Sequence, residues 1–434
     1  MSIDLTGLNG PQKEAVLCTE GPLLVLAGAG SGKTRVLTHR IAHLVDDLGV
    51  APWQIMAITF TNKAAAEMRE RLGNLIGPYS RGMWVSTFHS MCVRILRADC
   101  ERLGFASGFT IYDDDDSKRL VKQIYGELNI DEKRYPVPAI RNRISKAKND
   151  LQVAEVFAEE AEKSSDHISK VVAKVYSRLQ ERLRQLNAFD FDDLLLYSWL
   201  LLKNHPDVLA AYQQRFLYIL VDEYQDTNEV QDMIFAAISR NQTNMFMVGD
   251  VKQSIYRFRL AMPEIFLEKR SRFHSYDKRT YPATIILDKN FRSRKQVTDT
   301  VNYLFSQLMS EETGDISYTA EEELIPGADY IPSEDAQAEL HIVDMAGEEH
   351  PDGNMLCEAR YVAHLISDML DKGYQVQDKY GMRPCRPGDF CILLRSQKGK
   401  TSVYAEQLAL LDIRSWADTS GNFLTSREVS GIIS

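Results

Sequence analysis

Short apolar runs separated by longer segments of helical character make up most of this chain. RVLTHRIAHLV at 35–45 and TNKAAAEMRERLGNLI at 61–76 predict helices between the first strands. Strands that alternate with helices predict an α/β fold with a parallel sheet. The six predicted strands are LLVL at 23–26, IMAITF at 55–60, VSTF at 85–88, YILV at 218–221, MFMVGD at 245–250 and the start of TIILDKNFRS at 284–293.

The alternation stops between about residues 113 and 196. There, SKRLVKQIYGEL at 117–128 and VVAKVYSRLQERLRQL at 171–186 carry apolar residues at helical spacing, with acidic clusters around them. This stretch predicts an α-helical insertion within the first domain, after which the sheet resumes at Tyr218.

Length and composition agree with a globular protein of two or three domains. The chain has 434 residues, 44% of them hydrophobic and 26% charged, which is enough to bury a large core. No basic segment followed by an apolar core begins the chain, and no apolar stretch approaches the ~20 residues that span a bilayer. We therefore expect a cytoplasmic protein without a membrane partner. Its six cysteines lack the spacing of a metal site, so we expect reduced, structural thiols.

The net charge of −10 argues against a protein that coats nucleic acid indiscriminately. A local basic groove is still compatible with it, and three segments could line such a groove. They are the helix with Lys63, Arg69 and Arg71, the run RNRISKAK at 141–148, and RFRL at 257–260. Each is also compatible with an ordinary solvated helix face.

A phosphate-binding loop follows the first predicted strand. AGAGSGKT at 27–34 joins that strand to a helix, so loop N–H groups and the helix N-terminus would point at one anion. Lys33 would reach the β- and γ-phosphates, and the Thr34 hydroxyl would hold Mg²⁺. Ala27 stands where the usual motif has glycine, and a small residue still permits the turn. The alternative is a glycine-rich turn that only joins strand to helix.

An acidic pair follows a later apolar run, in YILVDEYQDTN at 218–228. A buried parallel strand would deliver these carboxylates to its C-terminal end, where ligands of open α/β sheets collect. Asp222 would hold Mg²⁺ through water, and Glu223 would orient or deprotonate the attacking water. Alone, such a pair usually marks a solvated strand end. Together with the phosphate loop, it predicts a nucleoside triphosphatase.

A third cluster, VGDVKQSIYRFRLA at 248–261, follows the next predicted strand. The Gln253 amide could sense a γ-phosphate by hydrogen bonding. Tyr256 and Phe258 would lie on one side of an extended segment, where they could stack on nucleic-acid bases. The alternative for both rings is ordinary core packing.

The order of these motifs resembles that of the UvrD/PcrA/Rep-like superfamily 1 DNA helicases. The likeness extends along essentially the whole chain, and from Val248 onward it is closer to the A subunit of AddAB helicase-nucleases. It is carried by LNGPQKEAV at 8–16, AGAGSGKT at 27–34, TFTNKAAAEM at 59–68, STFHSMCVRILR at 86–97, FDFDDLL at 189–195, VDEYQDTN at 221–228, GDVKQSIYRFRLA at 249–261 and NFRS at 290–293.

The resemblance implies a role for individual residues. Gln12 would read adenine, Phe291 would stack on the base, Arg292 would reach the γ-phosphate, and Gln225 and Asp226 would couple nucleotide to DNA. The implied nucleotide contacts are Gln12, Ala27, Gly28, Ala29, Gly30, Ser31, Gly32, Lys33, Thr34, Arg35, Phe291 and Arg292, with Thr34 and Asp222 on Mg²⁺. The implied catalytic residues are Lys33, Asp222, Glu223, Gln253 and Arg292. The implied DNA contacts are Thr61, Asn62, Lys63, Thr87, Phe88, His89, Tyr256, Phe258 and Arg259.

The implied fold is a P-loop RecA-like, doubly wound parallel sheet with an α-helical insertion and a partial second RecA-like domain. Residues 1–112 and 197–283 would form the first motor domain, 113–196 the insertion, and 284–434 the incomplete second domain. Because the chain ends at Ser434, before the family's last motor motifs, we expect it to bind ATP but to hydrolyse it slowly and not to unwind DNA.

The intact parent would be an ATP-dependent 3′–5′ DNA helicase in repair or recombination. Its partners would be single-stranded DNA, duplex–single-strand junctions and a nuclease or repair protein. Two alternatives stay open. One is a nucleotide-gated module that binds DNA or protein without processive work, and the other is a P-loop kinase or small-molecule ATPase that needs no DNA.

Overall fold

The computed structural model describes residues 3–314, 316–333, 336–344, 353–378, 380–397 and 399–417. The chain divides into two compact units, residues 1–328 and 329–434. The first unit contains all the predicted nucleotide and DNA motifs.

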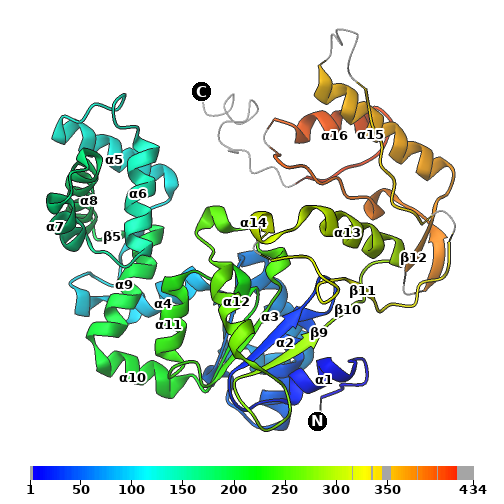
Figure 1. Ribbon diagram of the computed structural model, residues 1–434, viewed down its shortest axis with the longest axis horizontal. Helices are drawn as coiled ribbons and strands as arrows, with labels where there is room; N and C mark the ends of the chain where they lie inside the picture. Colours follow the sequence, from blue (N-terminus) through cyan, green and yellow to red (C-terminus); the bar gives the residue numbers. More distant parts are fainter. Residues whose placement is uncertain are drawn as a thin grey trace. The chain divides into compact units, whose positions relative to one another are not determined.

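Seven parallel strands form the central sheet of the first unit, in the order β3-β2-β6-β7-β1-β9-β8 (Figure 1). All six predicted strands are present in it. The bounds are β1 Leu23–Ala27, β2 Ile55–Thr59, β3 Trp84–Thr87, β6 Tyr218–Val221, β7 Met245–Gly249, β8 His274–Ser275 and β9 Ala283–Leu287. The predicted α/β class with a parallel sheet is confirmed.

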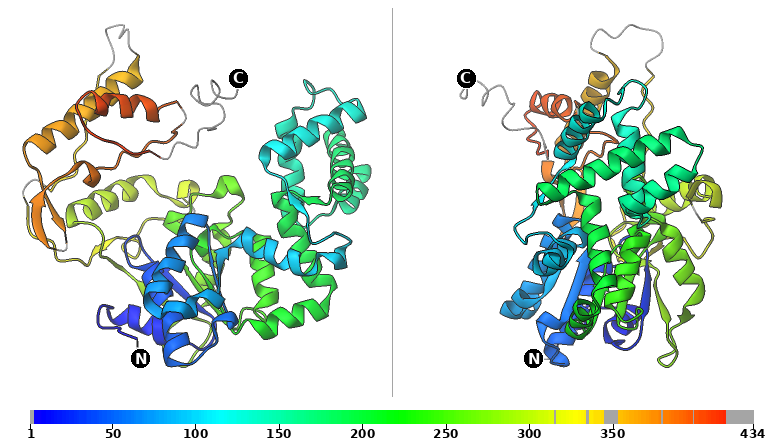
Figure 2. Two further views of the ribbon diagram at one scale, coloured as in Figure 1. Left: turned by 180° about the vertical axis from the view of Figure 1, so that it is seen from behind. Right: turned by 90° about the vertical axis from the view of Figure 1, so that its left-hand side faces the viewer.

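Helices cover both faces of the sheet, because alternate strand residues point to opposite sides (Figures 1 and 2). Leu23 and Val25 of β1 pack with α1–α3, while Leu24 between them belongs to the cluster with α4 and α9–α12. The first layer comprises α1 Gly10–Leu17, α2 Lys33–Ala42 and α3 Asn62–Ile76. The second comprises α4 Phe88–Asp99, α9 Phe191–Asn204, α10 Pro206–Arg215, α11 Glu229–Ile238 and α12 Pro263–Arg272. This is a doubly wound sheet.

Helices also occupy the segment expected as an insertion. They pack around an apolar cluster of their own, which includes Leu120, Ile140, Val172 and Tyr176. Two short parallel strands lie at the base of this segment. The bounds are β4 Thr110–Ile111, α5 Asp114–Leu128, α6 Val137–Asn149, α7 Ala154–Lys163, α8 His167–Gln185 and β5 Ala188–Phe189.

The domain boundary expected at residue 284 falls inside β9. This strand pairs with β1 along its whole length, from Leu23 opposite Ala283 to Ala27 opposite Leu287. The reason is burial, since Ala283, Ile285 and Leu287 lie in the same apolar cluster as β1. The sheet therefore extends past the expected boundary, and the first compact unit continues to Ala328. It ends with β10 Lys289–Asn290, α13 Lys295–Leu308, α14 Glu311–Gly314 and β11 Ile325–Pro326.

The second unit is smaller. Its apolar cluster joins Ala363 and Ile366 of α15 to Leu408 of α16. The bounds are α15 Asn354–Asp371, β12 Gln375–Asp378, β13 Gly381–Pro384 and α16 Thr401–Ala409, with β12 and β13 antiparallel. The assignment of residues after 284 to a second RecA-like domain stays a prediction. Across the described parts of both units, no helix is long and apolar enough to cross a bilayer.

Candidate functional site

The phosphate loop lies between the end of β1 and the first turn of α2. Gly30 and Gly32 have φ angles of 70° and 88°, which side chains with a Cβ rarely adopt. The hydroxyl of Ser31, which is buried, has no hydrogen-bond partner among the described residues. A loop that turns this tightly before a helix N-terminus and holds an unpartnered hydroxyl fits a bound phosphate oxygen.

Lys33 and Thr34 are the first residues of α2. The Lys33 ammonium donates to the carbonyl oxygens of Ala27 and Gly28, at 3.0 and 3.5 Å, so its cation lies over the loop. Burial lowers the pKa of Lys33, while the charges of Asp250 and Asp222 oppose that shift. The Thr34 hydroxyl donates to Asp222 Oδ2 at 3.1 Å. A hydroxyl and a carboxylate that converge in this way are suitable ligands for Mg²⁺.

Asp222 and Glu223 follow directly after β6. Burial raises the pKa of Asp222, and Lys33 and the Thr34 hydroxyl act against that shift. Burial together with the charge of Asp222 raises the pKa of Glu223 to about 7. Glu223 has a φ of 56°, an uncommon conformation for a residue other than glycine. A carboxylate with a pKa near neutrality is suited to accept a proton from water.

Gln225, Asp250 and Gln253 form a hydrogen-bonded group beside the acidic pair. Gln225 Oε1 accepts from the Asp250 N–H at 3.1 Å, and the Gln253 amide donates to Asp250 Oδ2 at 2.7 Å. A Cβ on Gly249 would lie 2.5 Å from Gln225 Oε1, so only glycine permits this contact. Burial raises the pKa of Asp226 to about 6. The acidic motif and the third motif thus meet through backbone and side-chain hydrogen bonds.

Gln12 lies against the phosphate loop. Its amide donates to the Ser31 carbonyl at 2.8 Å, and its Oε1 accepts from the Asn9 N–H at 3.0 Å. The second contact belongs to the capping box that starts α1, so one side chain fixes both the helix and the loop. Arg35, the remaining predicted nucleotide contact on α2, is exposed.

Asn290 reaches the phosphate loop from the segment after β9, and the sequence interpretation gave it no role. Its amide donates to the Ala29 carbonyl at 2.8 Å, while its Oδ1 accepts from the backbone N–H groups of Arg292 and Ser293 at 2.9 and 2.8 Å. Its place directly before the Phe291–Arg292 pair was the available signal. The Phe291 N–H also donates to the Gly30 carbonyl at 2.9 Å. Arg292 is exposed, and its charge contributes to the lowered pKa of Lys33.

Asp222 and Glu223 line part of a cleft of about 740 Å³. Phe60, His89, Phe191 and Phe258 contribute to its walls. Phe258 is 77% exposed, and its ring lies beside that of Tyr256, with 5.9 Å between centroids. The His89 ring meets Phe191 edge-on, with 5.8 Å between centroids. The cleft therefore combines exposed aromatic rings with the acidic site.

Comparison with known proteins agrees with this arrangement. A family model for the UvrD/REP helicase N-terminal domain matches residues 8–274. The chain belongs to the UvrD/REP helicase family. It is 47% identical over 299 residues to the ATP-dependent DNA helicase PcrA of Leuconostoc citreum, which is 68% of this chain and 38% of that protein.

The PcrA helicases of Bacillus subtilis (strain 168) and Staphylococcus aureus (strain Mu50 / ATCC 700699) are 46% and 45% identical to this chain over 300 and 304 residues. Those matches cover 69% and 70% of this chain. The chain spans 38–40% of the length of these three relatives. The UvrD/PcrA-like resemblance is confirmed, and the likeness of the later segments to AddA stays a prediction.

The predicted DNA contacts of this UvrD/REP family member have different surroundings. Thr61 and Thr87 cap α3 and α4, and their hydroxyls accept from the backbone N–H groups of Ala64 and Ser90. Asn62 and Lys63 are exposed in the first turn of α3.

The aromatic residues among these contacts also differ in exposure. The Tyr256 ring stacks on Phe60, with 4.3 Å between centroids. Phe88 is 6% exposed and packs edge-on against Phe235, so most of its ring is in the core. The side chain of Arg259 lies outside the described residues.

The six cysteines are free thiols, of which four are buried and Cys391 is exposed. In the described ranges, no group of three or more His, Cys, Asp or Glu residues could hold a metal ion by itself. A cation at Thr34 and Asp222 would therefore need ligands from outside the protein, such as phosphate oxygens and water.

Proposed function

We propose that this chain contains the nucleotide-binding part of an ATP-dependent DNA helicase, a motor that moves along single-stranded DNA. The observation that carries the proposal is that Asp222 and Glu223, the acidic pair predicted to act beside the phosphate loop, line a cleft that also contains an exposed aromatic ring, Phe258. Stimulation of hydrolysis by DNA would distinguish this motor from a P-loop kinase or a small-molecule ATPase, which needs no DNA.

ATP with Mg²⁺ would supply the phosphoanhydride bond whose hydrolysis releases free energy. Lys33 would bind its β- and γ-phosphates, and Thr34 and Asp222 would hold the cation. Glu223 would take the proton of the attacking water, because its pKa of about 7 leaves it partly ionised at neutral pH. Gln253 and Arg292 would respond to the γ-phosphate.

Single-stranded DNA would occupy the cleft. Base stacking on Phe258 and Tyr256 would hold the strand without selecting a sequence, since every base has an aromatic face. Asn62, Lys63 and His89 would contact the backbone. The net charge of −10 argues against binding over a broad basic surface.

Several finer assignments belong to the same proposal. They are 3′–5′ polarity, a role in repair or recombination, a nuclease or repair partner, a cytoplasmic location, and a second RecA-like domain after residue 284. Slow hydrolysis and no unwinding by the 434-residue chain also remain predictions. A nucleotide-gated binding module is the competing description.

Steady-state ATP hydrolysis, measured with and without single-stranded DNA, tests the proposal. We expect ATP to bind and Lys33→Ala to abolish binding. Any hydrolysis should disappear in Glu223→Gln while ATP binding is kept. A chain that binds neither ATP nor DNA would refute the proposal. Strong DNA stimulation that Glu223→Gln abolishes would refute the expected slow hydrolysis and would exclude a purely binding module.

A further inference from the structure

A chain of side-chain amides leaves the end of the acidic motif. Asn228 caps α11, and its Oδ1 accepts from the Gln231 N–H at 2.9 Å. Because the cap uses the oxygen of this amide, its nitrogen is left to donate elsewhere. It donates to Asn149 Oδ1 at 3.0 Å, across 79 residues of sequence. The loop with Asp222 and Glu223 is thus hydrogen-bonded at its far end to the helical segment.

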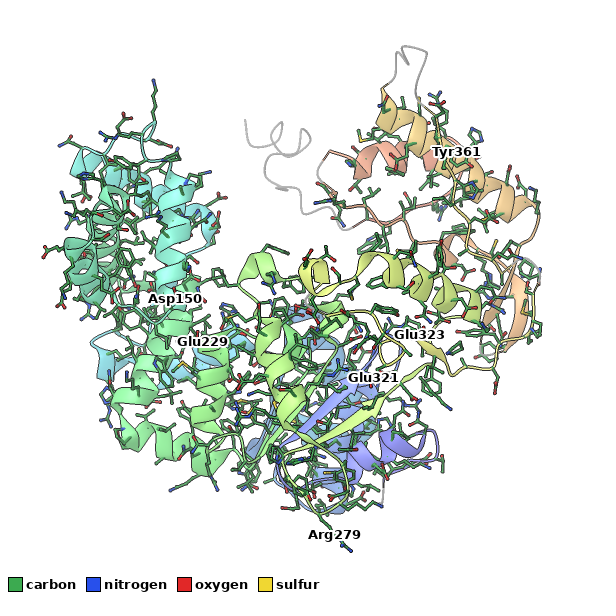
Figure 3. The ribbon with its side chains drawn as sticks, in the orientation of Figure 1. Asp150, Glu229, Arg279, Glu321, Glu323 and Tyr361 are labelled. Atoms are coloured by element: carbon green, nitrogen blue, oxygen red, sulfur yellow. The ribbon has the colours of Figure 1, made fainter. Side chains whose placement is uncertain are left out.

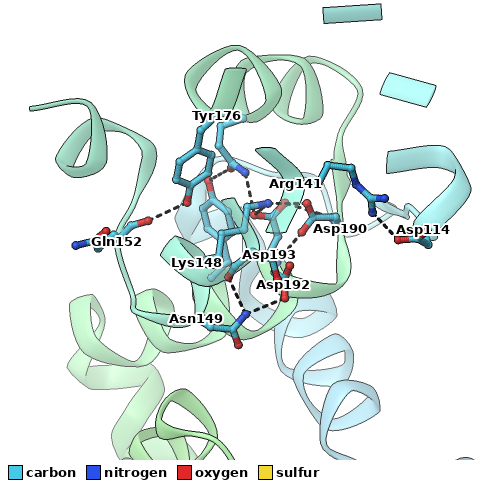
Figure 4. A network of polar contacts seen from close by, with 12 residues as sticks. Asp114, Arg141, Lys148, Asn149, Gln152, Tyr176, Asp190, Asp192 and Asp193 are labelled. Carbon is cyan, nitrogen blue, oxygen red and sulfur yellow. Dashed lines mark hydrogen bonds and ion pairs between the residues drawn. The ribbon is translucent and has the colours of Figure 1, made fainter. Parts of the chain in front are cut away.

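Asn149 joins three helices. It is the last residue of α6, and its amide nitrogen donates to the Ser145 carbonyl and to Asp192 Oδ1, both at 2.9 Å (Figure 4). Asp192 lies in the first turn of α9, and Asn228 precedes α11. Figure 3 labels Asp150 and Glu229, the residues that follow the two asparagines, at neighbouring ends of α6 and α11.

Lys148, the residue before Asn149, anchors the same end of α6 to α9. It is fully buried, and its ammonium lies 2.6 Å from Asp190 and 2.8 Å from Asp193 (Figure 4). Burial lowers the pKa of Lys148, but the charges of both aspartates raise it overall, so the lysine stays charged. Gln180 of α8 adds a hydrogen bond to Asp193 at 3.0 Å. The end of α6, the start of α9 and α8 are therefore held as one body.

Asn149, Asp192 and Asn228 all line the cleft, and the two ends of this polar chain lie beside different predicted contacts. Asp192 follows Phe191, whose ring is 51% exposed in the cleft wall against His89. Asn228 follows the loop in which burial raises the pKa values of Glu223 and Asp226. A ligand that moves the start of α9 would therefore displace the acidic loop through directional hydrogen bonds.

We propose that Asn149 is a positioning residue that couples DNA in the cleft to the nucleotide site through Asp192 and Asn228. This inference rests on the proposed function. Coupling between two ligands is reciprocal, so each ligand changes the affinity for the other by the same factor. That factor can be measured without hydrolysis.

The test uses the 434-residue chain, a fluorescent non-hydrolysable ATP analogue with Mg²⁺, and a labelled oligo-dT strand. The analogue is titrated with and without saturating oligo-dT, and the ratio of its two dissociation constants is the linkage factor. The variants are Asn149→Ala and Asn228→Ser, of which the second keeps a capping oxygen but is too short to reach Asn149. The matched control is Asn142→Ala, an exposed asparagine on the same helix.

Both variants should move the linkage factor toward one by about threefold to thirtyfold. The double variant should have the same linkage factor as the single variants, because both substitutions remove the same hydrogen bond between Asn228 and Asn149. Asn142→Ala should keep the wild-type factor. The inference is overturned if the wild-type factor is one, or if it is unchanged in Asn228→Ser. A wild-type chain that binds neither ligand would instead overturn the proposed function.

Discussion

The side-chain amide of Asn290 donates a hydrogen bond to the carbonyl oxygen of Ala29 at 2.8 Å, so a segment 261 residues away holds the phosphate loop. The same side chain caps the turn that presents Phe291 and Arg292. A nucleotide contact expected from a distant part of the sequence is thus attached directly to the loop that would hold the phosphates.

Asn290→Asp should weaken nucleotide binding about tenfold, because it removes the donor to Ala29 and adds a negative charge beside the phosphate loop, while it keeps the acceptor for Arg292 and Ser293. Titration with a fluorescent ATP analogue measures this effect. Asn142→Asp, at an exposed site, should leave the affinity unchanged. Wild-type affinity in Asn290→Asp would show that the loop keeps its shape without this hydrogen bond.

Glu223→Gln should stabilise the protein at alkaline pH. Burial raises the folded-state pKa of Glu223 from 4.5 to about 7, so the folded chain holds a proton that the unfolded chain releases in this window. Wild-type stability should therefore fall as pH rises from about 4.5 to about 7, by roughly 1–2 kcal/mol after solvent screening.

Urea unfolding at pH 4 and pH 8 tests this prediction. The wild type and Glu223→Gln should differ little at pH 4, and the variant should be the more stable at pH 8. The variant should hydrolyse no ATP at either pH. Glu223 would then be a residue that is needed for hydrolysis and that lowers stability. Equal stability at pH 8 would contradict the raised pKa.

Lys252→Met should lower the free energy of unfolding by about 3 kcal/mol, because it leaves the buried Asp250 carboxylate without its ion-pair partner and leaves Glu322 paired with Arg270 alone. The Lys252 ammonium lies 2.9 Å from Asp250 and 2.6 Å from Glu322. Asp250 also accepts a hydrogen bond from Gln253, the residue predicted to respond to the γ-phosphate. A displaced Asp250 would shift Gln253, so the affinity for ATP should fall as well.

Chemical denaturation measures the stability effect of Lys252→Met. Its control is Arg272→Met, which breaks an exposed ion pair with Glu268 at 2.9 Å and should change stability by less than about 1 kcal/mol. Similar losses in the two variants would mean that burial does not strengthen the Lys252 cluster.

Phe258→Ala should weaken oligo-dT binding by about 1–3 kcal/mol, the contribution of one stacked base, and should leave nucleotide affinity intact. Fluorescence anisotropy with labelled oligo-dT measures it. Tyr303→Ala removes another exposed aromatic ring, on α13, and should have no effect. If both variants bind DNA like the wild type, the strand does not stack on Phe258.

The positions of the central strands and the phosphate loop follow from local sequence. Apolar runs such as LLVL and YILV are typical of strands that are buried on both faces of a covered parallel sheet, and AGAGSGKT requires the conformational freedom that Gly30 and Gly32 show. Asp222, the first of the acidic pair after β6, accepts a hydrogen bond from Thr34. These features depend on side-chain type and short-range spacing, which one sequence contains.

Contacts between distant segments were decided by the tertiary structure. RNRISKAK was compatible with a solvated helix face or a basic groove, yet Lys148 within it is buried between Asp190 and Asp193. β9 was expected to lie at the start of a second domain, yet it pairs with β1. The sequence by itself determined which residue types follow each strand, and from these it predicts the groups that would bind phosphate and accept protons. Strand pairing and burial decide which of these groups lie next to one another in the folded chain. Neither can be read from local spacing in the sequence.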